Sequence, residues 1–133
     1  MLTLFPGLLF LAPLATTILR VTAGLVMLYV AYYSAMEREK IARERFPLIG
    51  HMPAWLLLFG ILVATVAGVL LIVGLWTQAA TIVGIILGLK HLIYARRYSG
   101  IMPLSTIAGI LLFVICLSLL FSGAGAVAVD LPL

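Results

Sequence analysis

Four long apolar runs, separated by short connections that hold most of the charge, constrain this chain more than any other feature. Each run is close to the ~20 residues that a helix needs to cross a bilayer. The 133 residues are 65% hydrophobic and 9% charged, whereas soluble domains are about 45–50% apolar and about 25% charged. The pattern excludes a soluble globular protein. It predicts an all-α fold, a polytopic membrane four-helix bundle with no soluble catalytic domain.

Prolines, tryptophans and charges set the expected helix limits. Pro13 suits a first helical turn, and the run that follows it stops at Glu37. The second run starts at Pro53, with Trp55 near one interface and Trp76 near the other, as in the aromatic belts of membrane proteins. The expected spanning helices cover residues 13–36, 53–74, 77–94 and 104–122.

Three further segments lie outside these helices. Residues 1–12 are an apolar lead that we expect to be retained at the membrane interface, because no basic residue precedes it as in a signal peptide. Residues 37–46 are strongly charged and are expected to extend the first helix beyond the bilayer, until Pro47 disfavours helix at the residue before it. This extension is either a solvated face that anchors to headgroups or a docking site for a partner. Residues 123–133 form an outer tail.

Basic residues predict the orientation of the chain. Cytoplasmic loops of membrane proteins are enriched in Lys and Arg. The first and third connections contain six such residues, whereas the second connection and both tails contain none; the six are Arg38, Lys40, Arg43, Arg45, Arg96 and Arg97. We therefore expect a multi-pass protein of the inner (plasma) membrane with both termini outside. Nucleic acid is not an expected partner, because the basic residues form no soluble face with interleaved aromatic residues.

Small residues recur every fourth position in the second and third helices. These ribbons are Gly60, Ala64 and Gly68 in the second helix, and Ala80, Gly84 and Gly88 in the third. Small residues let helix backbones approach closely in lipid. For an antiparallel hairpin that turns at residues 75–76, we expect Gly68 to face Gly84. By the same register Ala64 should face Gly88.

Arg20 is the deepest charge in the expected first helix. On a helical wheel it lies about 40° from Gly24, so it should point toward the other helices. A charged residue at mid-membrane costs at least ~2.5 kcal/mol, so it normally has a partner or contacts a wet cavity. No Asp or Glu lies in any expected span. The expected partners are Asp130 of the tail, neutral acceptors, water, lipid phosphate or a bound anion, and we predict that the tail folds back to bring Asp130 near Arg20.

Lys90, His91 and Tyr94 cluster near the cytoplasmic end of the third expected helix. Lys90 is interpreted as an anchor that reaches the interface, with a role in a site as the alternative. His91 should face the hairpin side, where a neutral imidazole can donate to a quinone carbonyl or shuttle a proton. The alternative is a histidine that is satisfied within the structure.

The sequence predicts no metal or haem site. His51 and His91 are the only histidines, and in the expected register they lie ~15 Å apart along the helix axis, too far to ligate one haem. Carboxylates and thiols are too few for other metal sites. Cys116, the single cysteine, is interpreted as a small buried hydrophobic residue.

Three segments resemble the DoxX family of four-helix membrane proteins. They are LRVTAGLVMLYVAY, VAGVLLIVGLWTQAA and GAGAVAVDLPL, and the resemblance covers residues 14–131. The matching positions are Arg20, Gly68, Gly74, Thr77, Gly123, Gly125 and Asp130. The chain departs from the family at Ala64, where the family often has Glu, at Gln78, where Arg is usual, and at Ala128, where Ser precedes the Asp.

This resemblance implies an accessory or quinone-facing subunit of a membrane redox system, since some family members are linked to thiosulfate:quinone oxidoreductase. Quinone would then bind near Arg20, or near His91 and Tyr94, and a redox partner subunit would supply the redox centre, because none is expected within this chain. The alternative is a noncatalytic membrane scaffold or assembly factor. Membrane lipids are the expected surroundings, and a second copy of the chain is a further expected partner. A small transporter ranks last because the two halves show no repeat.

Overall fold

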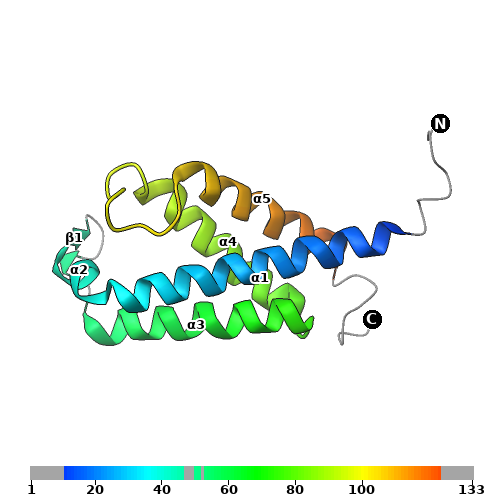
Figure 1. The fold of residues 1–133 in the computed structure, drawn as a ribbon, viewed down its shortest axis with the longest axis horizontal. Helices are drawn as coiled ribbons and strands as arrows, with labels where there is room; N and C mark the ends of the chain where they lie inside the picture. The colour runs from blue at the N-terminus through cyan, green and yellow to red at the C-terminus, as the bar shows by residue number, and fades with distance from the viewer. Residues whose placement is uncertain (1–10, 47–49, 52, 124–133) are drawn as a thin grey trace.

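The computed structural model describes residues 11–46, 50–51 and 53–123, and this part of the chain is mostly helical (Figure 1). Its helices are α1 (Ala12–Met36), α2 (Arg38–Arg43), α3 (Ala54–Val73), α4 (Thr77–Tyr94) and α5 (Thr106–Ser122). Two short antiparallel strands, β1 (Arg45–Phe46) and β2 (Gly50–His51), pair between α2 and α3. α1, α3 and α4 are long and apolar enough to cross a membrane, and α5 is a shorter apolar helix of 17 residues. The chain is therefore a helical protein of membrane-spanning character.

Local sequence explains where α3, α4 and α5 end or begin. Gly74 ends α3 in the left-handed conformation, with φ 79°, and its N–H donates to the carbonyl of Leu70. Trp76 also has a positive φ, 48°, so that α4 begins only three residues after Gly74. α5 begins at Thr106 and not at the expected residue 104, because the Ser105 side chain caps the helix by accepting from the N–H of Ala108 at 3.2 Å.

The expected helical extension over residues 37–46 is only partly helical. α1 ends at Met36, the short helix α2 follows, and the chain then turns into β1. Arg45 pairs with His51, and Phe46 with Gly50. The physical reason is that the proline after Phe46 favours extended backbone at that residue, which suits a strand and not a helix.

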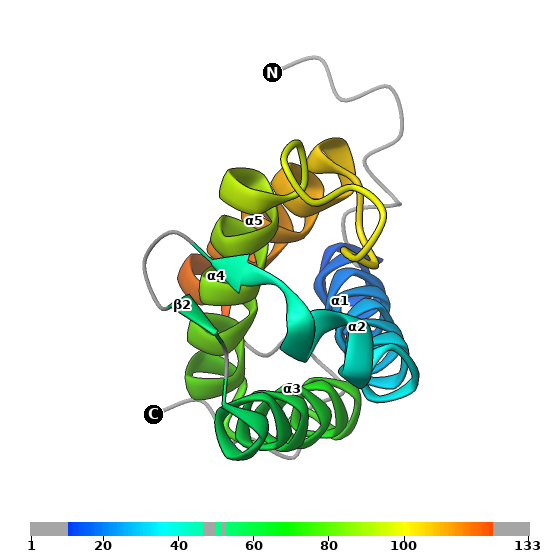
Figure 2. The same ribbon diagram turned by 90° about the vertical axis from the view of Figure 1, so that its left-hand side faces the viewer.

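The helices pack as two closely associated antiparallel pairs (Figure 2). α1 packs against α3 and α4 packs against α5, while the contacts of α3 with α4 and of α1 with α5 are less extensive. The four long helices share a core that contains the buried side chains of Met27 of α1, Leu71 of α3, Ala80 of α4, and Cys116 and Leu119 of α5.

The two ends of this assembly differ in character (Figure 1). At the turn end lie the starts of α1 and α4 and the ends of α3 and α5. At the connection end lie the two longer connections, between α1 and α3 and between α4 and α5. The Tyr98 hydroxyl joins these connections by donating to the carbonyl of Arg45 at 2.8 Å. The first and third expected loops therefore lie at the same end of the helices.

The small-residue ribbons of α3 and α4 do not face each other as predicted. Gly68 packs against Gly24 of α1, where a Cβ on Gly24 would lie 2.8 Å from the carbonyl oxygen of Gly68. Gly84 packs against Cys116, and Gly88 against Gly109, both on α5. A row of small residues permits close approach by any helix. Here the close partner of α3 is α1, and that of α4 is α5.

Three further positions complete this comparison. Ala64 and Ala80 are buried, as packing positions should be, although neither confirms the predicted register. Gly60 is exposed, and a Cβ placed on it would meet no atom within 4 Å. Gly60 is therefore not a helix contact, contrary to its predicted packing role.

Candidate functional site

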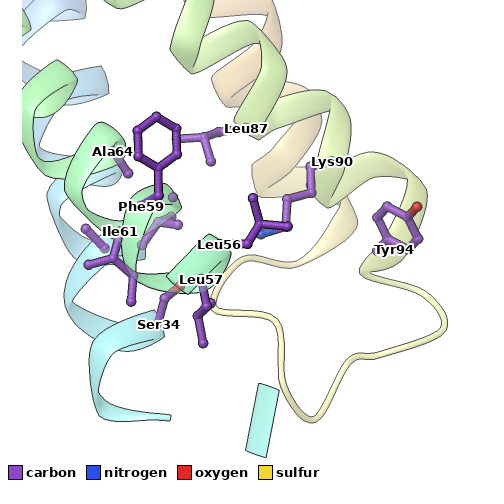
Figure 3. Close-up of a pocket in the computed structure, with 12 residues that line it drawn as sticks. Ser34, Leu56, Leu57, Phe59, Ile61, Ala64, Leu87, Lys90 and Tyr94 are labelled. Atoms are coloured by element: carbon purple, nitrogen blue, oxygen red, sulfur yellow. The ribbon is translucent and has the colours of Figure 1, made fainter. Parts of the chain in front are cut away.

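A cavity of about 290 Å³ lies toward the connection end, between α1, α3 and α4 (Figure 3). Val30 and Ala31 of α1, Leu57 and Ala64 of α3 and Leu87 of α4 contribute to its apolar lining. The cavity forms where the α1–α3 pair meets the α4–α5 pair, and α3 and α4 are less closely packed there than the helices within each pair. Its position and lining suit an apolar or amphipathic small molecule.

Polar side chains enter this lining from two helices. Ser34 comes from α1, and Lys90 and Tyr94 come from α4. Figure 3 shows the half-buried Lys90 side chain reaching from α4 toward Leu56 of α3, with Tyr94 at the edge nearest the α4–α5 connection. Among the described residues that line the cavity, no side chain is a carboxylate. Lys90 therefore brings a positive charge into a mostly apolar space.

His91 lies elsewhere, in the contact between α4 and α5. Its side chain is 0% exposed, and its Cβ lies against Gly109 of α5. Its Nδ1 is 2.7 Å from the Leu87 carbonyl, and because a carbonyl oxygen only accepts, Nδ1 carries the proton and donates. In the described part of the chain the buried Nε2 has no hydrogen-bond partner. Of these two residues Tyr94 lines the cavity and His91 does not, so the cavity does not bring them together.

Arg20 lies at the opposite end of the molecule. It is 1% exposed, which confirms that it points inward. Gly24, one turn later in α1, contacts Gly68 and Ile72 of α3, so Arg20 lies near the level of the α3–α4 turn. Thr77 is buried at the start of α4, at this same end. Asp130 lies outside the described residues, so its pairing with Arg20 stays a prediction.

The connection end is the strongly charged part of the surface. The six basic side chains of the two connections are all exposed there. Three acidic residues, Glu37, Glu39 and Glu44, lie in the first of these connections. Lys40 forms a 2.6 Å ion pair with Glu37, and this hydrogen bond raises the pKa of Lys40 above its usual value. Arg45 Nε donates to His51 Nε2 at 3.1 Å. Among the described residues, no group of three His, Cys, Asp or Glu side chains is placed to hold a metal ion.

Lys90 lines the cavity, whereas the sequence analysis favoured an anchor at the interface. Its spacing of three or four residues from Leu87 and Tyr94 places all three on one face of α4, and all three line the cavity. That spacing was visible in the sequence, but the sequence did not show that this face borders a cavity and not lipid.

The comparisons with known proteins leave this site to be judged on its own chemistry. No family model, no curated protein and no solved structure matches this chain.

Proposed function

We propose that α1, α3, α4 and α5 all cross the membrane, which makes the protein a four-helix membrane bundle. At 1.5 Å per residue, α5 is about 26 Å long, slightly less than the usual hydrocarbon thickness of about 30 Å. Its close packing along α4, a helix of 18 residues, supports a crossing at the same depth. α2 and the β1–β2 ribbon then lie outside the bilayer.

In this arrangement the protein lies in the inner (plasma) membrane. Its connection end faces the cytoplasm, and both chain termini lie outside. The gathering of six exposed basic side chains at one end supports this orientation. The turn end has Arg20 as its basic residue within the described ranges, and that side chain is buried.

For the activity, we propose a DoxX-like accessory subunit that holds a quinone for a membrane redox system. The observation that carries this proposal is the cavity between α1, α3 and α4, with Lys90 inside its apolar lining. A quinone ring is flat and apolar, and its carbonyl oxygens accept hydrogen bonds, which the Lys90 ammonium can donate. The volume of 290 Å³ suits the ring with little of its tail. In this proposal the present chain binds and orients the quinone, and a partner subunit supplies the electrons.

A noncatalytic scaffold or assembly factor is the second candidate. The exposed, charged surface of α2 favours it, because Arg38, Glu39 and Lys40 all project where a cytoplasmic partner can reach them. In this case the function needs no ligand in the cavity. The partners are cytoplasmic proteins that take part in the assembly or trafficking of other proteins.

One purification experiment separates the two candidates. The protein is isolated from its native membrane in mild detergent, co-purifying proteins are identified by mass spectrometry, and quinone is extracted and quantified. Gly60→Phe adds a ring at the cavity, where a Cβ meets no atom within 4 Å. Val69→Phe adds a ring at an exposed position of α3 away from the cavity and is the matched control.

For a quinone subunit, we expect the wild type and Val69→Phe to retain quinone and an oxidoreductase partner, and Gly60→Phe to lose the quinone. Wild-type protein that contains no quinone and brings down only assembly factors would reject the redox role in favour of the scaffold.

A further inference from the structure

The cavity opens sideways, between α3 and α4. Its back wall is α1, where Val30 and Ala31 are nearly inaccessible, at 3% and 4% exposure. On α3, by contrast, the lining residues Phe59 and Gly60 are exposed, Phe59 at 59%. In a membrane this outer side of α3 and α4 faces lipid. A ligand can therefore enter from the bilayer.

A second hollow lies farther along the same two helices. This groove, of about 240 Å³, lies nearer the turn end and is lined by Leu62, Val63, Val66, Ala67 and Leu70 of α3 and by Ala79, Ala80 and Val83 of α4. On α4, residues 83, 87, 90 and 94 recur at spacings of four, three and four, so the groove and the cavity share one helix face. The two hollows, which lie in line along α4, are together called the track; it is polar at the cavity end and apolar at the groove end.

Lys90 fixes the chemistry of the polar end. It lies four residues before the end of α4, and it is the charged side chain among the described residues that line the cavity. A lysine in apolar surroundings requires an anionic or hydrogen-bonding partner, because an unpaired buried charge is costly. The track thus matches an amphiphile with its head at the membrane boundary and its tail toward the bilayer centre.

We infer that the cavity and groove together bind one long-chain quinone with an ionised ring oxygen, which Lys90 holds while the alkyl tail lies between α3 and α4. This inference rests on the proposed quinone function and adds the charge state of the ring and the path of the tail. Lys90 thereby determines specificity, favouring ionised over neutral rings.

Two probes that differ only at one ring substituent test the charge selection. A 2-hydroxy-3-decyl-1,4-naphthoquinone is ionised near neutral pH, and its 2-methoxy analogue is neutral. Binding is followed in phosphatidylcholine nanodiscs by quenching of Trp55, which precedes the cavity residue Leu56, in a Trp76→Phe background. The reciprocal Trp55→Phe protein reports from the turn end and should be quenched less.

We expect the wild type to bind the hydroxy probe about tenfold more tightly than the methoxy probe, the equivalent of one charge-assisted hydrogen bond. Lys90→Met should abolish this preference, because the hydroxy probe loses an ionic hydrogen bond and weakens about tenfold more than the methoxy probe, which loses a hydrogen bond to a neutral carbonyl. Measurable binding of the methoxy probe then also shows that the variant is folded. Lys90→Arg should keep most of the preference.

The tail path is tested with hydroxy probes that carry a decyl or a methyl chain. Ala79→Phe fills the groove at an exposed position of α4. It should weaken binding of the decyl probe about tenfold, since several methylenes lose their contacts, and should leave the methyl probe unchanged. Equal effects on the two chain lengths would reject the groove as the path of the tail.

The remaining outcomes separate this inference from the function on which it rests. Equal wild-type affinity for the hydroxy and methoxy probes would overturn the charge selection and leave quinone binding intact. Absence of quenching by either probe would overturn both. Displacement of the hydroxy probe by added phosphatidylglycerol, in the wild type but not in Lys90→Met, would identify a lipid phosphate as the anion that Lys90 holds and would also overturn the inference.

Discussion

Two basic side chains, Arg20 and Lys90, lie within the described spanning helices, and they lie toward opposite ends of the molecule. Charges at such positions are costly in a bilayer and usually have a structural or functional counterpart. Arg20 is buried among the helices at the turn end, whereas Lys90 lines the cavity between α1, α3 and α4. The different surroundings suggest different counterparts: the chain itself for Arg20, and a ligand for Lys90.

A double-mutant cycle tests the counterpart of Arg20. Arg20→Ala and Asp130→Ala should each destabilise the protein by about 3–5 kcal/mol, because either change leaves one buried charge without its opposite. The double variant should lose much less than the sum of the two. The measurement is the free energy of unfolding in detergent. Additive losses would reject the pair and favour a lipid phosphate or another anion as the counterpart.

Glycine contacts give a second prediction for single residues. A Cβ on Gly88 would lie 2.9 Å from the Phe113 backbone nitrogen and 3.0 Å from the Gly109 carbonyl, so α5 must move away. Gly88→Ala should therefore lower stability by about 1–3 kcal/mol. Gly60→Ala meets no atom within 4 Å and should be neutral or stabilising by up to ~1 kcal/mol through helix propensity. Thermal unfolding in detergent measures both, and equal melting temperatures would contradict the packing of α4 on α5.

Among the elements, the helices were predictable from the sequence, whereas their partners were not. α3 covers Ala54–Val73, close to the expected residues 53–74, because the apolar run and its proline and glycine boundaries are local signals. Which helix packs on Gly68 or Gly84 depends on the whole chain. The partners of these two residues are Gly24 and Cys116, and neither lies in the hairpin.

The candidate site was only partly predictable for the same reason. A helical wheel gives the angle between His91 and Lys90, but it does not show which neighbour each one meets. His91 meets α5 and is buried, while Lys90 meets the space left between α3 and α4. Both residues were therefore visible in the sequence, but which of them borders a cavity was not.

The hydrogen bond between the two long connections gives a prediction for these elements. Tyr98→Phe removes the bond from the Tyr98 hydroxyl to the Arg45 carbonyl, at a cost of about 0.5–1.5 kcal/mol. The β1–β2 ribbon should then open more often, and trypsin should cleave after Arg43 and Arg45 faster. Tyr32→Phe, at an exposed position of α1, is the control. Equal cleavage rates in the two variants would show that this bond does not hold the ribbon.

At the scale of the whole molecule, the surface charge and the two hollows are both arranged along the direction from the connection end to the turn end. The exposed basic side chains lie at the connection end, the cavity lies next to them, and the apolar groove continues toward the turn end. An amphiphile from the cytoplasmic leaflet has the same polarity, with its head near the basic end and its tail toward the bilayer centre. The proposed orientation in the membrane therefore also decides which leaflet supplies the ligand.

Cysteine labelling tests that orientation. Cys116 is 0% exposed, so the native protein should not react with a membrane-impermeant maleimide. Thr3→Cys and Ala126→Cys, at positions beyond the described residues, should be labelled on intact cells. Ser99→Cys, at an exposed position between α4 and α5, should be labelled only after permeabilisation. This result follows from the six basic residues of the two connections, which favour the cytoplasmic side. Labelling of Ser99→Cys alone on intact cells would reverse the topology and place the mouth of the cavity in the outer leaflet.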